Sequence, residues 1–205
     1  MVSKIDTAWD LFLEGKASEA KKLVEQDFSI DTCTDFSLLN LMGYLLLAEK
    51  DYASCTHIFE KYILLAQQNE DKENEHIGLH QLAMIYRDQG DFHKALKLIE
   101  DEEKIVEEYF PNDNLKKAVN NYEQGYVRFK LNNLDEALTF MNLSLEQSLR
   151  TDDVISQACS YRGLGEIYLA FGDTQLANMH FEKAIELFKS VDESEGIKEI
   201  EKLMT

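Results

Sequence analysis

One phrase recurs five times in this chain. A segment with helical character ends in Gly-Asp or a polar equivalent, and an aromatic or aliphatic residue and a small residue then open the next segment. The clearest copies begin at Gly90 (GDFHKALKLI) and Gly172 (GDTQLANMHF). The small residues of the five copies, 35 to 42 positions apart, are Ala20, Cys55, Ala95, Ala137 and Ala177. Internal periods of this length predict a helical solenoid.

A second set of small residues lies twelve positions upstream of the first. Its members are Ala8, Gly43, Ala83, Gly125 and Gly165. Small residues on both segments allow two antiparallel helices to approach closely, so each unit is predicted to be a helical hairpin. Within the third unit, Leu79, Leu82, Ala83 and Tyr86 follow the i, i+3, i+4, i+7 spacing of one helical face.

These residues resemble the tetratricopeptide repeat family, whose pattern is a small residue, a tyrosine three positions later, a Gly-Asp turn and an alanine. The pattern is met twice, by Ala83, Tyr86, Gly90, Asp91 and Ala95 and by Gly165, Tyr168, Gly172, Asp173 and Ala177. The resemblance covers nearly the whole chain, with a period longer than the usual 34 residues. The fourth unit departs from the pattern. It has Arg128 in place of tyrosine, and Asn132 in a turn where asparagine can adopt the left-handed conformation.

The resemblance implies an all-α fold, a right-handed α-α superhelix of five helical hairpins followed by a C-terminal capping helix. A single solenoid is expected over residues 1–205. Its units lie at about 3–30, 35–68, 73–110, 115–150 and 154–190, with the cap at 192–204. Ile197, Ile200 and Leu203 give the cap one apolar face, as the end of a solenoid requires.

Composition excludes several classes of protein. The formal net charge of −18 disfavours nucleic acid as a partner, because binding to a polyanion depends on Lys and Arg contacts to phosphates. No segment is apolar enough for a membrane span, and no leader is apparent at the N-terminus, so a cytoplasmic protein with no membrane contact is expected. The three cysteines are too irregularly spaced for a zinc site or a disulfide framework. Cys55 is expected to act as a compact hydrophobe.

In tetratricopeptide-repeat proteins, the first helix of each hairpin lines a concave groove. Carried over to this chain, the resemblance predicts a peptide-binding site made of Asn40, Tyr44, His80, Met84, Arg87, Tyr122, Tyr126, Lys130, Arg162 and Glu166.

Three of these groove residues, Arg87, Lys130 and Arg162, are cations in a chain with 39 acidic and 21 basic residues. They favour an extended, acidic peptide, or one that ends in a carboxylate, because an arginine can hold a carboxylate through two charge-assisted hydrogen bonds. In the alternative interpretation, Arg87 and Arg162 pair within the protein, with acids such as Asp88, Glu123 or Glu166.

The function predicted from the sequence is a non-enzymatic protein-interaction module without a cofactor, acting as an adaptor or regulator. One alternative is a structural scaffold or oligomerisation protein that uses its convex or terminal surfaces. Another is a metal-dependent enzyme at His76 and His80, which lie four positions apart on one predicted helix. The sequence there lacks the glutamate that a helical zinc-hydrolase motif places after its first histidine, and it offers no third ligand. His76 is expected to be a surface residue at a helix end.

The first unit carries three apolar residues, Trp9, Phe12 and Leu13, which is more than an end unit needs. They bury themselves either against the helix that follows or against another subunit. The second alternative predicts a homodimer through the N-terminal unit.

Overall fold

A computed structural model describes residues 3–204 of the chain. Contacts between residues divide it into two compact units, residues 1–98 and 99–205, and each unit is described by itself. The boundary falls inside α6 (Phe92–Tyr109), which contributes its first part to unit 1 and the rest to unit 2. Every regular element among the described residues is an α-helix.

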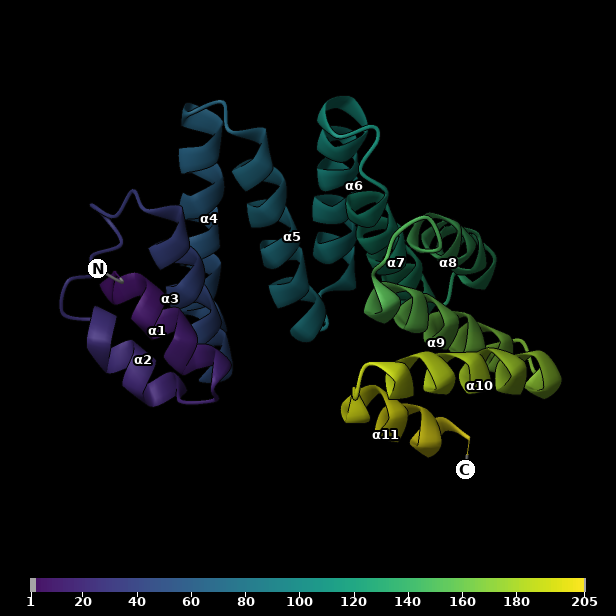
Figure 1. The fold of residues 1–205 in the computed structure, drawn as a ribbon. Coiled ribbons are helices and arrows are strands. Elements are labelled where there is room, and N and C mark those ends of the chain that lie inside the picture. The colour runs from purple at the N-terminus through teal and green to yellow at the C-terminus, as the bar shows by residue number, and fades with distance from the viewer. Residues whose placement is uncertain (1–2, 205) are drawn as a thin grey trace. The chain divides into compact units, whose positions relative to one another are not determined.

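Unit 1 contains two helical hairpins and the helix that follows them (Figure 1). Its helices before α6 are α1 (Lys4–Leu13), α2 (Ala17–Val24), α3 (Phe36–Ala48), α4 (Tyr52–Gln68) and α5 (Lys72–Asp88). Helices α1 and α2 pack together, as do α3 and α4, and α5 packs on α4. The core is built mainly from α3 and α4 and includes Leu39, Leu41, Leu45, Ile58 and Phe59.

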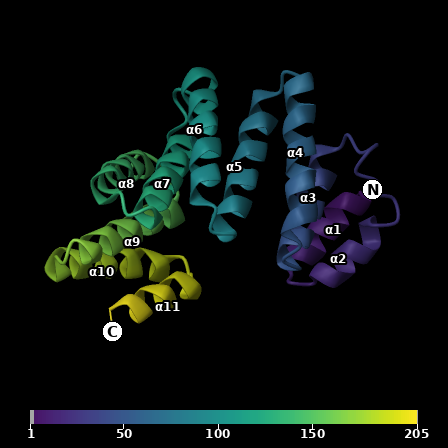
Figure 2. The same ribbon diagram turned by 180° about the vertical axis from the view of Figure 1, so that it is seen from behind.

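Unit 2 continues the same plan (Figure 2). After α6 come α7 (Asn114–Lys130), α8 (Leu134–Ser148), α9 (Val154–Ala170), α10 (Thr174–Ser190) and α11 (Ser194–Leu203). Helix α7 pairs with α8 and α9 pairs with α10, while α11 packs on α10 as the expected C-terminal cap. Its residue Ile200 is fully buried. The all-α helical-repeat fold predicted from the sequence is confirmed.

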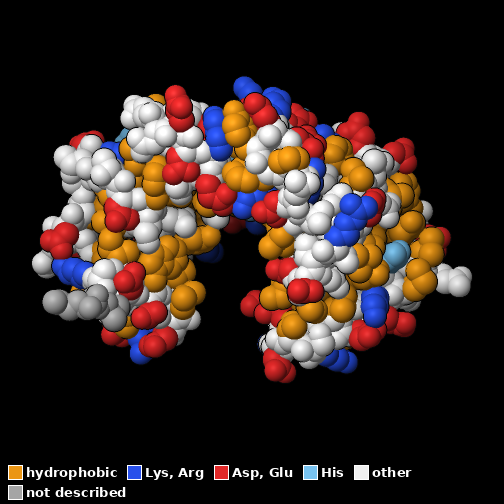
Figure 3. Space-filling model, turned by 45° about the horizontal axis from the view of Figure 1, so that its top comes forward, with side chains coloured by type: hydrophobic (Ala, Val, Ile, Leu, Met, Phe, Trp, Pro, Cys, Tyr) orange, Lys and Arg blue, Asp and Glu red, His pale blue; other side chains and the backbone are white. Residues whose placement is uncertain are grey.

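Aspartates begin most of the helices. A carboxylate at the N-cap accepts a hydrogen bond from a backbone N–H of the first turn, which otherwise has no partner. The aspartates that do so are Asp35, Asp51, Asp71, Asp113, Asp153 and Asp173. At Asp71, hydrogen bonds from Asn74 lower the pKa of the carboxyl group. Part of the acidity therefore has a structural role. Other acidic side chains are scattered over the surface, as the face in view in Figure 3 shows.

Most of the turns between the described helices contain one residue in the left-handed backbone conformation. Glycine supplies it at Gly15, Gly90 and Gly172, with φ between 78° and 82°. Four other residues adopt it with a side chain, namely Lys50, Glu70, Asn132 and Asp192. Asn132 has a φ of 63°, which confirms the prediction for the turn of the fourth hairpin.

Small residues allow the paired helices to approach as predicted. A Cβ atom added at Gly43 would lie 2.4 Å from the ring of Phe59, and one at Gly165 would lie 2.4 Å from Phe181. Cys55 is fully buried, and its thiol donates to the carbonyl oxygen of Gly43 at 3.3 Å. Burial raises the pKa of the Cys55 thiol to about 12, so the thiol is neutral and serves as packing.

A further set of glycines lies where one hairpin meets the next. A Cβ atom at Gly78 of α5 would meet Ile63 of α4 at 2.7 Å. At Gly163 of α9 it would meet Met141 of α8 at 2.4 Å. The close packing of successive hairpins thus also depends on glycine at these positions. The repeat pattern did not reveal this feature.

The apolar residues of α1 are covered in part by the chain itself. The ring of Trp9 lies 5.9 Å from that of Tyr44 on α3, and the ring of Phe12 lies 5.8 Å from it. The indole N–H of Trp9 donates to Ser37 at 2.9 Å. Leu13 is 77% exposed. The neighbour of Trp9 and Phe12 is therefore α3, and a homodimer through this end stays a prediction.

Candidate functional site

The ten residues of the predicted site all lie on first helices of hairpins, α3, α5, α7 and α9. Eight of them occupy two positions that repeat from helix to helix. Asn40, His80, Tyr122 and Arg162 lie three positions before the small residue of their helix, and Tyr44, Met84, Tyr126 and Glu166 lie one position after it. Five of the ten residues belong to unit 1 and five to unit 2.

The five residues of unit 2 form one cluster on α7 and α9, which we call the α7–α9 cluster: Tyr122, Tyr126, Lys130, Arg162 and Glu166. The rings of Tyr122 and Tyr126 are stacked at 6.3 Å. The Lys130 ammonium lies 4.9 Å from the centre of the Tyr126 ring. The guanidinium of Arg162 donates a 2.8 Å hydrogen bond from Nη2 to the hydroxyl oxygen of Tyr122. Aromatic, cationic and acidic side chains thus meet on one surface.

Arg162 also has two acidic partners. Its Nε lies 3.7 Å from Glu166, one turn further along α9, and its Nη1 pairs with Glu199 of α11. The Nε itself has no hydrogen-bond acceptor within the described residues. The alternative of an internal pair with Glu166 is therefore present in the structure. Glu199 was not among the acids foreseen from the sequence.

Burial controls the ionisation of this cluster. It raises the pKa of the Glu166 carboxyl group, although Arg162 and Lys130 act in the opposite direction. It also raises the pKa of Tyr122, whose phenol is therefore protonated at neutral pH. Within the described residues no acceptor binds the Tyr122 O–H, so the hydroxyl can donate to a ligand while it accepts from Arg162.

Lys130 differs from Arg162 because its side chain is exposed and makes no ion pair within residues 3–204. It lies over the rings of Tyr126 and Phe129, at 4.9 and 5.1 Å. The positive charge of Arg162, by contrast, is balanced by Glu166 and Glu199. The cluster thus offers one exposed cation, without a close ion-pair partner in residues 3–204, above an aromatic surface.

Two of the predicted residues of unit 1, Tyr44 and Arg87, make separate contacts. Tyr44 accepts a 2.9 Å hydrogen bond from Gln81 and packs on Trp9 and Phe12, and burial raises its pKa. Arg87 lies beside Asp88, with 3.4 Å between Nε and Oδ1, as the pairing alternative stated.

The other three predicted residues of unit 1, Asn40, His80 and Met84, are half-buried. The Oδ1 atom of Asn40 is buried and accepts no hydrogen bond from the described residues.

The metal-site alternative rested on His76 and His80. His76 is buried, at 8% exposure, so its predicted place on the surface is wrong. Its Nε2 lies 3.6 Å from Glu73. The residues that the structure describes include no group of three or more His, Cys, Asp or Glu side chains that could hold a metal ion. The described helices also include none long and apolar enough to cross a bilayer.

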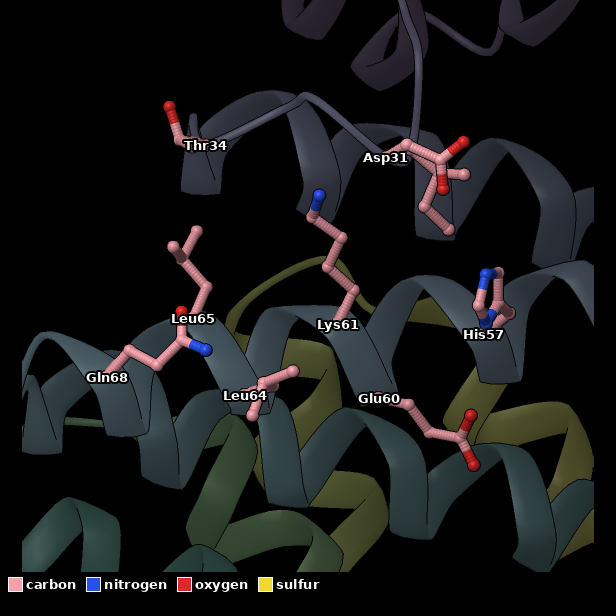
Figure 4. A pocket seen from close by; sticks show the side chains of 9 residues that line it. Asp31, Thr34, His57, Glu60, Lys61, Leu64, Leu65 and Gln68 are labelled. Carbon is pink, nitrogen blue, oxygen red and sulfur yellow. The ribbon is translucent and has the colours of Figure 1, made fainter.

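Sequence reasoning missed a cavity of about 530 Å³ in unit 1. One wall is the segment between α2 and α3, which carries Asp31 and Thr34 (Figure 4). The other wall is the outward face of α4, with His57, Lys61 and Leu64. These residues lie on a second helix and on a connecting segment, outside the repeat positions from which the site was predicted.

Sequence reasoning also missed the role of Arg128, the residue that replaces the expected tyrosine. It is 7% exposed and donates hydrogen bonds of 3.0 Å to Glu100 and to Glu136. Its guanidinium lies 4.2 Å from the centre of the Phe140 ring. Arg128 therefore ties α6, α7 and α8 together inside unit 2 and belongs to its packing.

Comparison with known proteins agrees with this architecture. Residues 113–190 match a family model described as tetratricopeptide repeat, and residues 78–101 match a second model of the same description. No curated protein matches the sequence.

Several solved structures are similar in fold. BtubC from P. vanneervenii has a TM-score of 0.75 and 17% identity, over 92% of this chain and 80% of that one. A kinesin light chain-like protein of Podosopora anserina, with nearly identical TPR-like repeats, has a TM-score of 0.71 and 18% identity, over 92% and 94%. MamA from Desulfovibrio magneticus has a TM-score of 0.63 and 18% identity, over 91% and 94%. The repeat pattern, the hairpins and the two family matches lead to one conclusion: this chain carries tetratricopeptide repeats at residues 78–101 and 113–190, and such repeats serve as protein–protein interaction modules.

Proposed function

We propose that this protein binds a short extended peptide with a carboxylate side chain, and that the α7–α9 cluster provides the contact surface. Binding would let the protein act as an adaptor or regulator of the partner that carries the peptide. The observation that carries the proposal is the position of Lys130, an exposed cation held over Tyr126 next to the hydrogen-bonded pair of Tyr122 and Arg162.

Each part of the cluster suits a different part of a peptide. The stacked rings of Tyr122 and Tyr126 give a flat apolar area with polar edges, a type of surface common in protein interfaces. The O–H of Tyr122 can donate to a peptide carbonyl group. The ammonium group of Lys130 can pair with a carboxylate without first losing an ion pair from the described chain.

The test uses a fluorescein-labelled peptide, Gly-Leu-Glu-Leu-Gly with an amidated C-terminus, and its Gln counterpart. Fluorescence anisotropy should show binding of the Glu peptide and clearly weaker binding of the Gln peptide. Lys130→Gln should weaken binding of the Glu peptide by about three- to tenfold. Lys189→Gln, which removes an exposed lysine from α10, is the matched control and should change nothing.

Two results would contradict the proposal. One is equal affinity for the Glu and Gln peptides. The other is an equal effect of Lys130→Gln and Lys189→Gln, which would favour the scaffold alternative. The same Glu peptide with a free C-terminus shows whether a terminal carboxylate binds better than a side chain.

A further inference from the structure

We infer that Arg162, backed by Tyr122, forms a subsite for a single carboxylate, and that Glu199 of α11 is its built-in occupant, which the carboxylate of a partner must displace. The inference rests on the proposed function, because Arg162 belongs to the α7–α9 cluster. It adds a regulatory element to that function and narrows the chemistry of the partner.

Glu199 reaches Arg162 from a helix that is held in place by other contacts. Helix α11 docks on α10 through Ile200, which is fully buried, and through Gly196, where an added Cβ atom would lie 2.7 Å from the Phe188 ring. The ion pair between Glu199 and Arg162 is a separate polar tie from α11 to α9. Breaking this pair leaves the apolar contacts of α11 with α10 intact.

The two acidic partners of Arg162 differ in how readily they can leave. Glu166 is on α9 itself, and its side chain is 17% exposed, as is that of Arg162. Glu199 is 52% exposed, so water can solvate its carboxylate as soon as it moves away. Ion pairs with an exposed partner are weak. Arg162 itself is sheltered and stays charged, so it needs an acceptor in place of Glu199.

A partner can reach this point from solvent. Arg162 and Glu199 both line a depression of about 260 Å³, together with Ile155, Cys159 and Gly196. Ile155 is 51% exposed, which gives the depression an apolar edge. The Nε of Arg162 is itself buried, so an incoming carboxylate would meet the Nη1 atom that Glu199 now holds.

The charge around the depression restricts what can enter. Two further acids, Glu193 and Glu195, line it beside Glu199. A run of several carboxylates would be repelled there, whereas one carboxylate next to an apolar residue meets both Arg162 and Ile155. The predicted partner is therefore a segment with a single Asp or Glu flanked by aliphatic residues.

The test compares Glu199→Gln with Glu201→Gln, which removes an exposed carboxylate from the same helix. The probe is again the labelled Gly-Leu-Glu-Leu-Gly amide. Glu199→Gln should bind it about fivefold more tightly than the wild type, because the internal competitor is lost. Glu201→Gln should bind it as the wild type does. Arg162→Gln should weaken binding and abolish the effect of Glu199→Gln in the double variant.

Arg162→Lys serves as a second variant if Arg162→Gln does not fold, because it keeps the charge and loses the fork of donors. Hydrogen exchange gives a readout without ligand: the amides of α11 should exchange severalfold faster in Glu199→Gln than in Glu201→Gln. Equal exchange in the two variants would show that the pair between Glu199 and Arg162 does not form in solution, and would overturn the inference.

The binding outcomes separate the two proposals. If the wild type and Glu199→Gln bind the probe equally and both depend on Lys130, the inference is wrong and the proposed function stands. If neither protein binds the probe, the proposed function is wrong and the inference is lost with it.

Discussion

Tyr122 and Arg162 occupy the same position in successive repeats, 40 residues apart, and the guanidinium of one donates a 2.8 Å hydrogen bond to the hydroxyl of the other. Two side chains at equivalent repeat positions are thus in direct contact between α7 and α9. Tyr122→Phe removes the acceptor and leaves the ring. We expect the free energy of unfolding to fall by about 0.5–1.5 kcal/mol.

Urea denaturation followed by circular dichroism measures this loss. Tyr52→Phe is the control, because the Tyr52 hydroxyl makes no hydrogen bond within the described residues. Equal losses for the two variants would show that the contact with Arg162 contributes nothing to stability.

Glu166 links stability to pH. Burial raises its pKa in the folded protein, so folding penalises the ionised carboxylate at neutral pH. As pH falls through the folded-state pKa, the folded protein binds the proton first and the penalty disappears. Glu166→Gln should therefore be more stable than the wild type at pH 7.

This advantage of Glu166→Gln should shrink towards pH 4, where the unfolded chain also binds the proton. Urea denaturation curves measured at several pH values between 4 and 8 check the trend. An advantage that grows on acidification would contradict the assigned direction of the pKa shift.

Arg128 should be important for the stability of unit 2. Arg128→Met removes the hydrogen bonds to Glu100 and Glu136 but keeps an apolar stem beside Phe140. Both acids are partly exposed and can be rehydrated, but the buried side-chain oxygen of Gln124 also loses the 2.7 Å hydrogen bond that Arg128 donates to it. We therefore expect a loss of about 1–3 kcal/mol, and a larger loss for Arg128→Ala.

The control for this prediction is Arg150→Met. Arg150 pairs with Glu146, and both side chains are more than half exposed. Its loss should change stability by less than about 0.5 kcal/mol. Equal losses of stability in Arg128→Met and Arg150→Met would show that burial does not make Arg128 more important for stability.

At the left-handed turn residues we expect a substitution to raise the stability of the protein. Glu70 adopts a φ of 54°, a conformation that costs a residue with a Cβ atom about 1 kcal/mol. Glu70→Gly should therefore stabilise the protein by about 0.5–1 kcal/mol. Asn132→Gly should gain less, because asparagine tolerates the left-handed region. Thermal melting of both variants measures the difference, and a destabilised Glu70→Gly would be evidence against strain at this turn.

The fold could be predicted from the sequence because its signals are local. The pair of Gly165 and Ala177, with the turn at Gly172, specifies a hairpin within a few turns of helix. The equivalent positions of Tyr122 and Arg162 followed from the same period, but the hydrogen bond between them was not predicted. Gly163 was not recognised, because its contact with Met141 joins two hairpins and has no fixed spacing in the repeat.

The partners of Arg128 and Arg162 could not be predicted in full. Glu199 reaches Arg162 because α11 docks on α10 in one register, which is decided by Ile200 and Phe188 in three dimensions. In the sequence, Arg128 was seen only as a departure from the repeat pattern, which has tyrosine at this position. Its acids, Glu100 and Glu136, lie on the helices before and after it, where many other glutamates are equally placed in the sequence.

The buried thiol of Cys55 has a practical consequence. It sits between α3 and α4, with its sulfur directed at the Gly43 carbonyl, so a thiol reagent can attack it only when these two helices separate. The rate at which Cys55 is labelled under native conditions therefore counts how often the second hairpin opens. Cys55 thus reports local unfolding without an engineered label, once its reaction is resolved from those of the half-buried Cys33 and Cys159.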